Sequence, residues 1–244
     1  KLKANLMIAS LSAVLLAGCG QDKDTTPTTA ETTATSAIEL SDAAVENLVK
    51  RSWQFVAMYN VNNKGAMLYK GWNLCDVDTK LKDHTLKLIA RPNNDSLYIS
   101  CPIDLRKEPV ILDMPAFDSK YVSLMVTGYD HYVNIPMSTR QGDFKKPEKM
   151  LFFSERTAGY KKGEQVEGVD RYFEASGDFL SAVFRVMPHA NEAERFDRIK
   201  DQMQSVKLLT LSQLRGDKAK PTDGVEFPPV GKTALDVFEN NLLE

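Results

Sequence analysis

The sequence has little cysteine, no excess of charge of one sign and no hydrophobic run long enough to cross a membrane. Lys and Arg number 31 against 33 Asp and Glu, which leaves no basic stripe of the kind that nucleic acid binding requires. With 43% hydrophobic and 26% charged residues, the composition excludes collagen-like and wholly disordered chains. At 244 residues the chain can bury a core without metals or disulfides, and we expect one sizeable domain.

The familiar catalytic motifs are also missing. The chain has no Gly-x-Ser-x-Gly elbow, no Ser-x-x-Lys, no Gly-x-Gly-x-x-Gly, no P-loop and no His-Glu-x-x-His. Its three histidines, His84, His131 and His189, lie far apart, so we predict no metal site and no cofactor. Asp76 and Asp78 mimic the first ligands of a calcium loop, but the Gly and terminal Glu do not follow, and we expect an exposed turn there.

The first forty residues predict an export signal and a lipid anchor. Lysines precede an uncharged apolar run, Leu6–Ala17, which is shorter than the roughly 20 residues that span a bilayer. The following Leu-Ala-Gly-Cys, ending at Cys19, resembles the lipobox of bacterial lipoproteins. We therefore expect a lipoprotein signal peptide over residues 1–18, with lipidation of Cys19 as the membrane anchor; the alternative is an ordinary secretion signal. Gly20 favours the outer membrane, facing the periplasm.

Beyond the anchor, a Thr-rich tether over residues 19–40 carries no aliphatic side chain large enough to pack, except at its end. A single globular domain is expected over residues 41–244, with soluble partners in the cell envelope. The remaining cysteines, Cys75 and Cys101, would lie in an oxidising compartment, where a disulfide is permitted. Two buried thiols are the alternative.

The mature domain is predicted to be mostly β with flanking helices, an α+β fold. The helical spacing of Val45, Leu48, Val49, Val56 and Tyr59 along one face predicts an N-terminal helix over residues 42–59, followed by a turn-rich stretch. Short β-rich runs then recur at 85–90, 96–101, 109–114, 120–127, 131–135, 149–155, 169–176 and 179–187. Eight such strands suggest an antiparallel β-sandwich or a jelly-roll-like barrel.

Two C-terminal helices complete the predicted fold. Asn191 with Glu194 resembles a capping box, and Phe196, Ile199, Met203 and Val206 form the apolar stripe of the helix that follows. After a proline-rich connector, a last short helix carries Leu235, Phe238 and Leu242. We interpret the apolar stripes of the helices as core.

Two polar segments supply the candidate ligand-binding residues. The first contributes Arg91, Asn93, Asp95 and Tyr98, and the second contributes Asp130, His131, Tyr132, Asn134 and Arg140. No residue can be assigned a catalytic role from the sequence.

Strand phase predicts where the second segment points. Val122, Leu124 and Val126 mark the core-facing side of a strand, and an unbroken register would turn Asp130, Tyr132 and Asn134 to that side. A bulge at Gly128 would turn His131 inward instead. Either register places a polar side chain inward, in a buried hydrogen-bond network or in a ligand pocket. An exposed loop is the third alternative.

These segments also carry a resemblance to a known family. The stretch Arg-Pro-Asn-Asn-Asp-Ser-Leu-Tyr at 91–98 is similar to the bacterial domain of unknown function 1254. Further matching positions are Asp104, Leu105, Glu108, Pro109, Val110, Tyr121, the 130–134 segment, Arg185, Gln202, Gln204 and Phe238. The resemblance spans roughly residues 42–243. It implies no activity. Many relatives carry a second domain of unknown-function type 1214, so we expect another protein to complete any pocket shared between two such domains.

We therefore predict a membrane-tethered envelope lipoprotein of unknown activity that acts as a binding module for a small molecule or an envelope protein. An acid/base or hydrolytic enzyme is the first alternative, with Asp95 or Asp130 as base, His131 or Tyr98 as acid, and Arg91 or Arg140 as the oxyanion partner. A structural interaction protein is the second alternative. The binding hypothesis and the enzyme hypothesis both require that the two polar segments share one hollow.

Overall fold

The computed structural model describes residues 40–68, 71–85 and 93–220. The chain divides into two compact units, residues 1–51 and 52–244, and both sheets belong to the second. The predicted signal peptide, Cys19, Arg91, nearly all of the 85–90 strand and the 235–242 helix lie outside the described residues, as does the tether up to residue 39.

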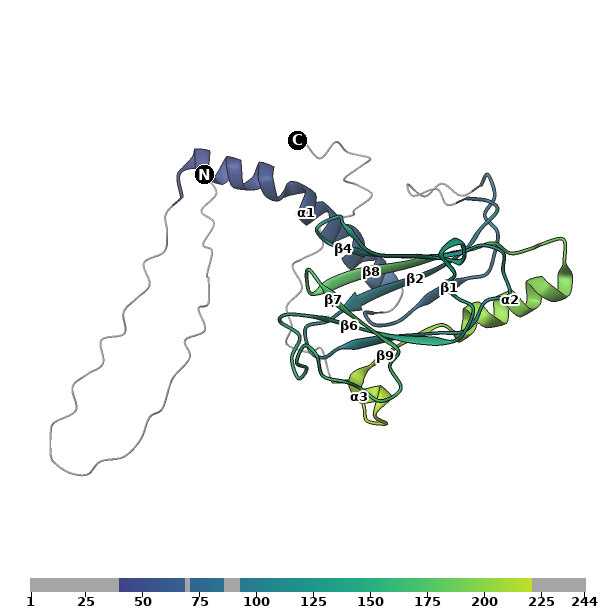
Figure 1. Cartoon of the computed structure of the whole chain (residues 1–244). Helices are drawn as coiled ribbons and strands as arrows, with labels where there is room; N and C mark the ends of the chain where they lie inside the picture. The colour runs from purple at the N-terminus through teal and green to yellow at the C-terminus, as the bar shows by residue number, and fades with distance from the viewer. Residues whose placement is uncertain (1–39, 69–70, 86–92, 221–244) are drawn as a thin grey trace, which may run out of the picture. The chain divides into compact units, whose positions relative to one another are not determined.

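Nine strands form two sheets in the described part of the chain (Figure 1). Sheet A, in the order β1-β2-β8-β4-β5, consists of β1 (Asp76–Asp78), β2 (Leu97–Asp104), β8 (Phe179–Val186), β4 (Val122–Gly128) and β5 (Val133–Ser138). Sheet B, in the order β7-β6-β3-β9, consists of β7 (Arg171–Ala175), β6 (Glu148–Ser154), β3 (Val110–Met114) and β9 (Lys207–Thr210).

The predicted fold class is confirmed: the domain is mostly β, with two open sheets stacked as a sandwich and helices beside them (Figure 1). One detail departs from the prediction of an antiparallel sandwich, because β6 and β7 pair in parallel. The long 155–170 connection returns the chain to the same end of the sheet, and this return is what a parallel pair requires.

Alternating side chains build the core between the two sheets. Val122, Leu124 and Val126 are buried, which confirms the core-facing phase predicted for β4. Sheet B contributes Leu112 and Phe152 to the same cluster. The opposite face of sheet B packs a second, smaller cluster of buried hydrophobic residues made of Ile111, Leu151, Phe153, Val166 and Leu211. Sheet B is therefore covered on both faces.

Helix α1 (Asp42–Leu68) is longer than the predicted 42–59 helix. It continues because Tyr59, Asn63 and Ala66, spaced four and three residues apart, form one buried face. The stripe that the sequence assigned to the core is mostly exposed, and this prediction was wrong for Val45, Leu48, Val49 and Val56, which are 41–58% exposed. Of that stripe, only Tyr59 is buried.

Helix α2 (Ala193–Ser205) follows β8, and its stripe packs as predicted. Ile199 and Met203 are buried in the core and Phe196 packs against it. The predicted cap is not formed: Glu192 is the N-cap, and its side chain makes no capping hydrogen bond. The remaining helices are η1 (Thr139–Gln141) and α3 (Leu211–Leu214), which begins with a complete capping box at Thr210.

Cys75 and Cys101 are joined by a disulfide. Strand β1 pairs antiparallel with β2, with Asp76 opposite Ser100, so the two cysteines stand directly opposite each other, with Cα atoms 4.3 Å apart. Asp76 and Asp78 therefore belong to an edge strand rather than to the turn that the sequence predicted.

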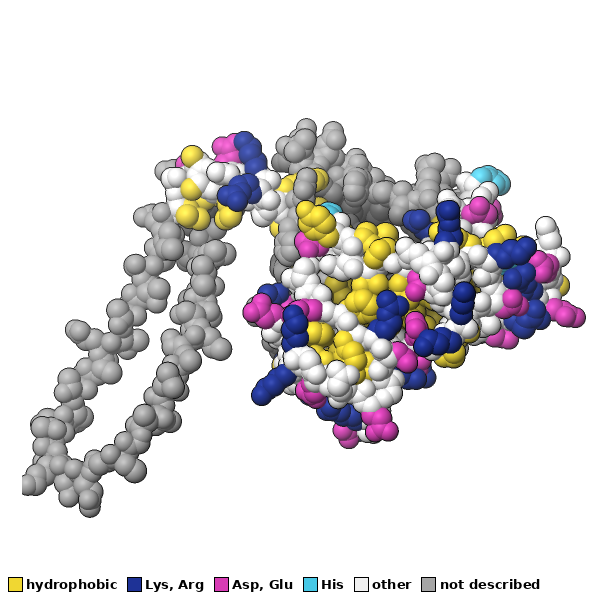
Figure 2. All heavy atoms as spheres, viewed as in Figure 1, with side chains coloured by type: hydrophobic (Ala, Val, Ile, Leu, Met, Phe, Trp, Pro, Cys, Tyr) yellow, Lys and Arg dark blue, Asp and Glu magenta, His cyan; other side chains and the backbone are white. Residues whose placement is uncertain are grey.

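The surface carries intermixed charges of both signs, as the sequence balance predicts. Lys and Arg alternate with Asp and Glu over the visible face in Figure 2, with hydrophobic side chains toward its middle. Among the described helices, none combines the length and the apolar character needed to span a bilayer.

Candidate functional site

The two predicted polar segments lie at opposite ends of sheet A. Tyr98 pairs with Arg185 near the end of β8, whereas Gly128 pairs with Leu180 near its start. Arg185 and Leu180 are five positions apart, or about 17 Å, and each segment extends farther outward. The expectation of one shared hollow is therefore wrong. We call these two ends of the sandwich the Tyr98 end and the Asp130 end.

At the Tyr98 end, the first segment forms a local turn. Asn93 and Asp95 are exposed, and the backbone N–H of Asn93 donates to the Tyr98 hydroxyl at 2.8 Å. Arg140 also lies at this end, because it directly follows β5, whose Ser138 pairs with Ser123. Arg140 is thus separated from the rest of its predicted segment.

At the Asp130 end, the second segment is an exposed hairpin between β4 and β5. The Gly128 N–H donates to the Tyr132 carbonyl and the His131 N–H donates to the Gly128 carbonyl, while His131 adopts a left-handed φ of 69°. Asp130, His131, Tyr132 and Asn134 are all exposed, so neither predicted register places one inward. The strand ends at Gly128, and the chain reverses before either register can continue.

Buried polar groups are concentrated at this same end of the sandwich. Six of them occupy or adjoin strand termini there: Asn63, Asp104, Glu108, Ser154, Thr157 and Thr210. Burying polar side chains is unfavourable unless each is paired, so such a concentration marks a candidate functional region. The opposite end buries only Ser96, Ser119 and His189 among the described residues.

A concave site opens at the Asp130 end, between the ends of β6 and β7 and the β4–β5 hairpin. Its volume is about 360 Å³, and we call it the polar hollow; it is lined by Asn134, Ser154, Glu155, Arg156, Glu174, Ala175 and Ser176. The volume falls within the range of small-molecule sites. Of the sequence-predicted residues, Asn134 lines it, and Asp130 supports it through a hydrogen bond.

Hydrogen bonds from three strand ends fix the walls of the polar hollow. The Ser176 hydroxyl donates to Asp130 at 2.6 Å, which ties the end of β7 to the hairpin. The Ser154 hydroxyl donates to one oxygen of Asp178 at 2.8 Å, and the Arg156 Nε donates to the other at 3.1 Å. The walls are therefore held together by side chains that can also meet a guest.

The polar hollow has a negative charge balance. Glu155 and Glu174 line it beside Arg156, while Lys162 donates to Glu174 from just outside. This hydrogen bond raises the pKa of Lys162 above its ordinary value, so Lys162 stays charged. The lining thus offers several hydrogen-bond acceptors and more negative than positive charge.

Gly128 lets the hairpin close over these groups. A Cβ at this position would lie 2.7 Å from Asp130 Oδ1 and 2.9 Å from Asn134 Nδ2. We expect Gly128→Ala to displace both exposed side chains and, by breaking the hydrogen bond from Ser176 to Asp130, to lower the free energy of unfolding by about 0.5–1.5 kcal/mol. Urea denaturation measures this loss. Gly177→Ala is the matched control, since no atom lies within 4 Å of its Cβ position; equal stability of the two variants would contradict the prediction.

An aromatic cluster adjoins the same end, on the face of sheet A that points away from sheet B. Tyr129 stacks on Phe179 with ring centroids 5.4 Å apart, and Tyr59 of α1 meets both rings edge-on. Trp72 packs 5.0 Å from Phe179, and the Arg106 guanidinium lies 4.6 Å above the same ring. The second half of α1 is therefore fastened to sheet A by aromatic contacts.

Two buried polar groups in this cluster have no partner. Both amide atoms of Asn63 and the hydroxyl of Tyr129 lack a hydrogen bond among the described residues. Burial raises the pKa of Tyr129 far above its ordinary value of 10.0, with smaller contributions from Tyr59 and Asp104, so its hydroxyl remains a donor. Burial also raises the pKa of Tyr59, against a smaller lowering by the neighbouring Asn63 amide.

We expect Asn63→Leu to raise the free energy of unfolding by about 1–2 kcal/mol, because it removes an unsatisfied buried amide at nearly constant volume. Asn62→Leu is the matched control for helix propensity, since Asn62 donates to the Met58 carbonyl on the same helix. Chemical denaturation of both variants gives the difference. A loss of stability in Asn63→Leu would contradict the prediction and would mean that the amide is satisfied in the folded protein, by the neighbouring Tyr59 or by a bound water or guest.

His189, at the Tyr98 end, belongs to a closed structural network. The Lys120 N–H donates to its Nε2 at 3.1 Å, and its Nδ1 lies 3.2 Å from the Glu192 carboxylate. Arg195 then bridges Glu192 and Asp118. These bonds tie α2 to the loop before β4.

Among the described residues, no group of three His, Cys, Asp or Glu could hold a metal ion.

Sequence reasoning missed the residues of the polar hollow at and just beyond the ends of β6 and β7, namely Ser154, Glu155, Arg156, Glu174 and Ser176, together with Asp178, which bonds to Ser154. A signal existed in the Ser-Gly-Asp sequence at 176–178, a polar turn between two strands. Only the three-dimensional pairing of β6 with β7 brings that turn beside the 154–156 segment.

Comparisons with known proteins agree with this architecture. A family model described as "Protein of unknown function (DUF1254)" matches residues 74–207, more than half of the chain but less than the 42–243 span expected from the sequence. The chain is similar to the crystal structure of the VPA0106 protein from Vibrio parahaemolyticus, with 21% identity and a TM-score of 0.53. That match covers 75% of this chain and 43% of that chain, and it shows the fold alone.

A second solved structure, an uncharacterised protein from Burkholderia cenocepacia, matches with 12% identity and a TM-score of 0.36, over 71% of this chain and 44% of that chain. The chain thus spans less than half the length of either solved structure. A search of the curated proteins found no match.

Proposed function

We propose, for this chain that belongs to the DUF1254 family of proteins of unknown function, that it acts as a binding module for a small hydrophilic molecule in the polar hollow. The observation that carries the proposal is a preformed concavity of about 360 Å³ whose walls are cross-linked by hydrogen bonds from three strand ends. A preorganised site loses little entropy when it binds a guest.

The lining defines the chemistry of the guest. Glu155 and Glu174 accept hydrogen bonds, while Asn134 and Ser176 can donate as well as accept. Lys162 pairs with Glu174 and Arg156 pairs with Asp178, so Glu155 is the lining charge without an ion-pair partner among the described residues, and it favours a neutral or cationic molecule rich in hydroxyl or amine donors, such as an amino sugar. An anionic guest would meet net repulsion.

The separation of the two polar segments removes both the shared binding site and the acid/base enzyme that the sequence predicted, so the proposal rests on the polar hollow alone. That enzyme needs Asp95 and Asp130 to converge on one substrate, and these residues belong to opposite ends of sheet A. The proposed oxyanion partner, Arg140, also lies away from Asp130.

Three sugars of one ring size and different charge test the proposal: glucosamine, N-acetylglucosamine and glucuronate. We expect the melting temperature of the full chain to rise with millimolar glucosamine, less with N-acetylglucosamine, and not with glucuronate. Glu174→Gln should abolish the rise, and Glu167→Gln, an exposed residue outside the hollow, should preserve it. No rise with any sugar, or an equal rise in Glu174→Gln, would refute the proposal.

We further propose that the module is tethered to the cell envelope through a lipid on Cys19. The lipobox-like sequence supports this, as does the Cys75–Cys101 disulfide, a bond that oxidising compartments permit. In a bacterial host, Cys19→Ala should move the chain from the membrane fraction to the soluble envelope fraction. Retention of the variant in the membrane fraction would contradict a lipid anchor.

A further inference from the structure

We infer that the exposed face of sheet A carries a second binding site, separate from the polar hollow, for a single-chain amphipathic carboxylate. Its polar half is a row of donors centred on Arg185, and its apolar half is the groove beside that row. Nothing in this inference depends on the proposed function of the polar hollow.

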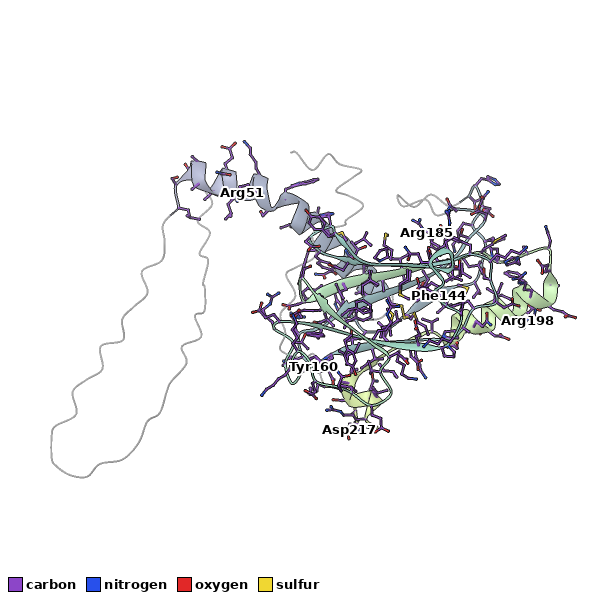
Figure 3. The ribbon with its side chains drawn as sticks, viewed as in Figure 1. Arg51, Phe144, Tyr160, Arg185, Arg198 and Asp217 are labelled. Atoms are coloured by element: carbon purple, nitrogen blue, oxygen red, sulfur yellow. A yellow bond between two sulfur atoms is a disulfide. The ribbon has the colours of Figure 1, made fainter. Side chains whose placement is uncertain are left out.

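The row of donors follows from strand register. Arg185 of β8 pairs with Ser123 of β4, and Ser123 pairs with Ser138 of β5. On the other side, Arg185 pairs with Tyr98 of β2. Directly paired residues point to the same face, here the one away from sheet B, since the neighbouring Leu124 is buried in the core. Arg185 lies on this outer side of sheet A in Figure 3.

Among the described residues, Arg185 differs from most other arginines in its lack of a charge partner. No carboxylate of the described residues forms an ion pair or a hydrogen bond with it, and its side chain is exposed. Carboxylates do pair with Arg106, Arg156, Arg171, Arg195, Arg198 and Arg215. A guanidinium between hydroxyl donors on a rigid central strand can receive an anion in a charge-assisted, bidentate contact.

The next row along the strands is apolar. Val183 of β8 pairs with Met125 of β4, which pairs with Pro136 of β5. Met125 is 39% exposed, and Val133, at the start of β5, is 44% exposed. Together with the Arg185 row, these residues line a groove of about 400 Å³. Apolar side chains exposed side by side in a groove are a signature of binding sites.

The two rows define one occupant. They are two residues apart along each strand, or about 7 Å, so a carboxylate held at Arg185 places the first carbons of its chain over Met125 and Val183. Asp143 lies beside Ser138 and accepts a hydrogen bond from the Ser138 N–H at 2.9 Å. Its carboxylate is also 3.7 Å from the Arg171 guanidinium, so its negative charge is already compensated and does not oppose an anionic ligand at Arg185.

Laurate is the probe. Dodecyltrimethylammonium has the same alkyl chain with a positive charge, and acetate has the carboxylate without the long alkyl chain. Titration calorimetry is carried out in detergent-free buffer on the full chain bearing Cys19→Ser, which keeps acyl groups off the protein. We expect laurate to bind, and dodecyltrimethylammonium and acetate to bind at least tenfold more weakly.

Variants separate the groove from other apolar parts of the chain. Arg185→Gln should weaken laurate at least tenfold, and Met125→Asp should abolish binding, while circular dichroism confirms that both fold. Arg215→Gln, an exposed arginine on α3's flank, and Glu174→Gln, in the polar hollow, should leave laurate affinity unchanged. Equal binding of laurate by Arg185→Gln and the unsubstituted chain, or equal binding of dodecyltrimethylammonium and laurate, would overturn the inference.

Discussion

Reduction of the Cys75–Cys101 disulfide should lower the free energy of unfolding by about 3.5 kcal/mol. The bond closes a loop with a sequence separation of 26, and the chain-entropy relation gives this value for a loop of that length. The bond also holds the three-residue β1 on the edge of sheet A, beside β2. A three-residue strand forms few backbone hydrogen bonds with its neighbour. We therefore expect β1 to separate from β2 before the other strands do when the disulfide is reduced.

Urea denaturation with and without dithiothreitol measures the effect on the unsubstituted chain. Cys75→Ala/Cys101→Ala provides the covalent control, and it should not respond to dithiothreitol. Amide hydrogen exchange should show faster exchange at 76–78 in the reduced protein. A stability change below about 1 kcal/mol on reduction would contradict the prediction and would show that strain in the folded state or residual structure in the unfolded chain offsets the loop-closure entropy.

Arg106→Gln should lower the free energy of unfolding by about 3 kcal/mol, because it leaves a buried carboxylate without its charge partner. The Asp104 side chain is 1% exposed, and Arg106 donates to both of its oxygens, at 3.0 and 2.9 Å. Asn73 holds the Asp104 backbone from the other side. The same substitution also removes the guanidinium above Phe179.

Arg156→Gln is the matched control for that loss. The Arg156 side chain is 62% exposed in its pair with Asp178, and exposed pairs contribute about 0–1 kcal/mol. Denaturation of both variants in urea should separate them by about 2 kcal/mol or more. Equal stability of Arg106→Gln and Arg156→Gln would contradict the prediction that the Asp104–Arg106 ion pair stabilises the Asp130 end of the sandwich.

The strands of the core could be predicted from sequence, because alternation of side chains is a local property. The β4 phase at Val122, Leu124 and Val126 is the clearest case. Strands β1 and β9 were not predicted, since they have only three and four residues and lack a repeat long enough to recognise. The extension of α1 depended on tertiary contacts of Tyr59 and overrode the turn-forming composition beyond it.

The candidate site could be predicted only in part. Asp130 and Asn134 do lie at the polar hollow, and their exposure reflects a hairpin that closes immediately after Gly128. Pairing of β2 with β8 then carries Tyr98 to the far end of the sheet, which no local pattern encodes. The same order brings Arg185 beside Ser123, residues that are distant in sequence and unremarkable within their own strands.

We propose that the polar hollow binds a guest, and chemical-shift mapping of the full chain with glucosamine tests this binding most directly. We expect backbone amide shifts to change with sugar concentration at 128–134, 154–156 and 174–178, and not in Glu174→Gln. Unchanged spectra, or changes centred on other residues, would contradict a binding site at this end of the sandwich.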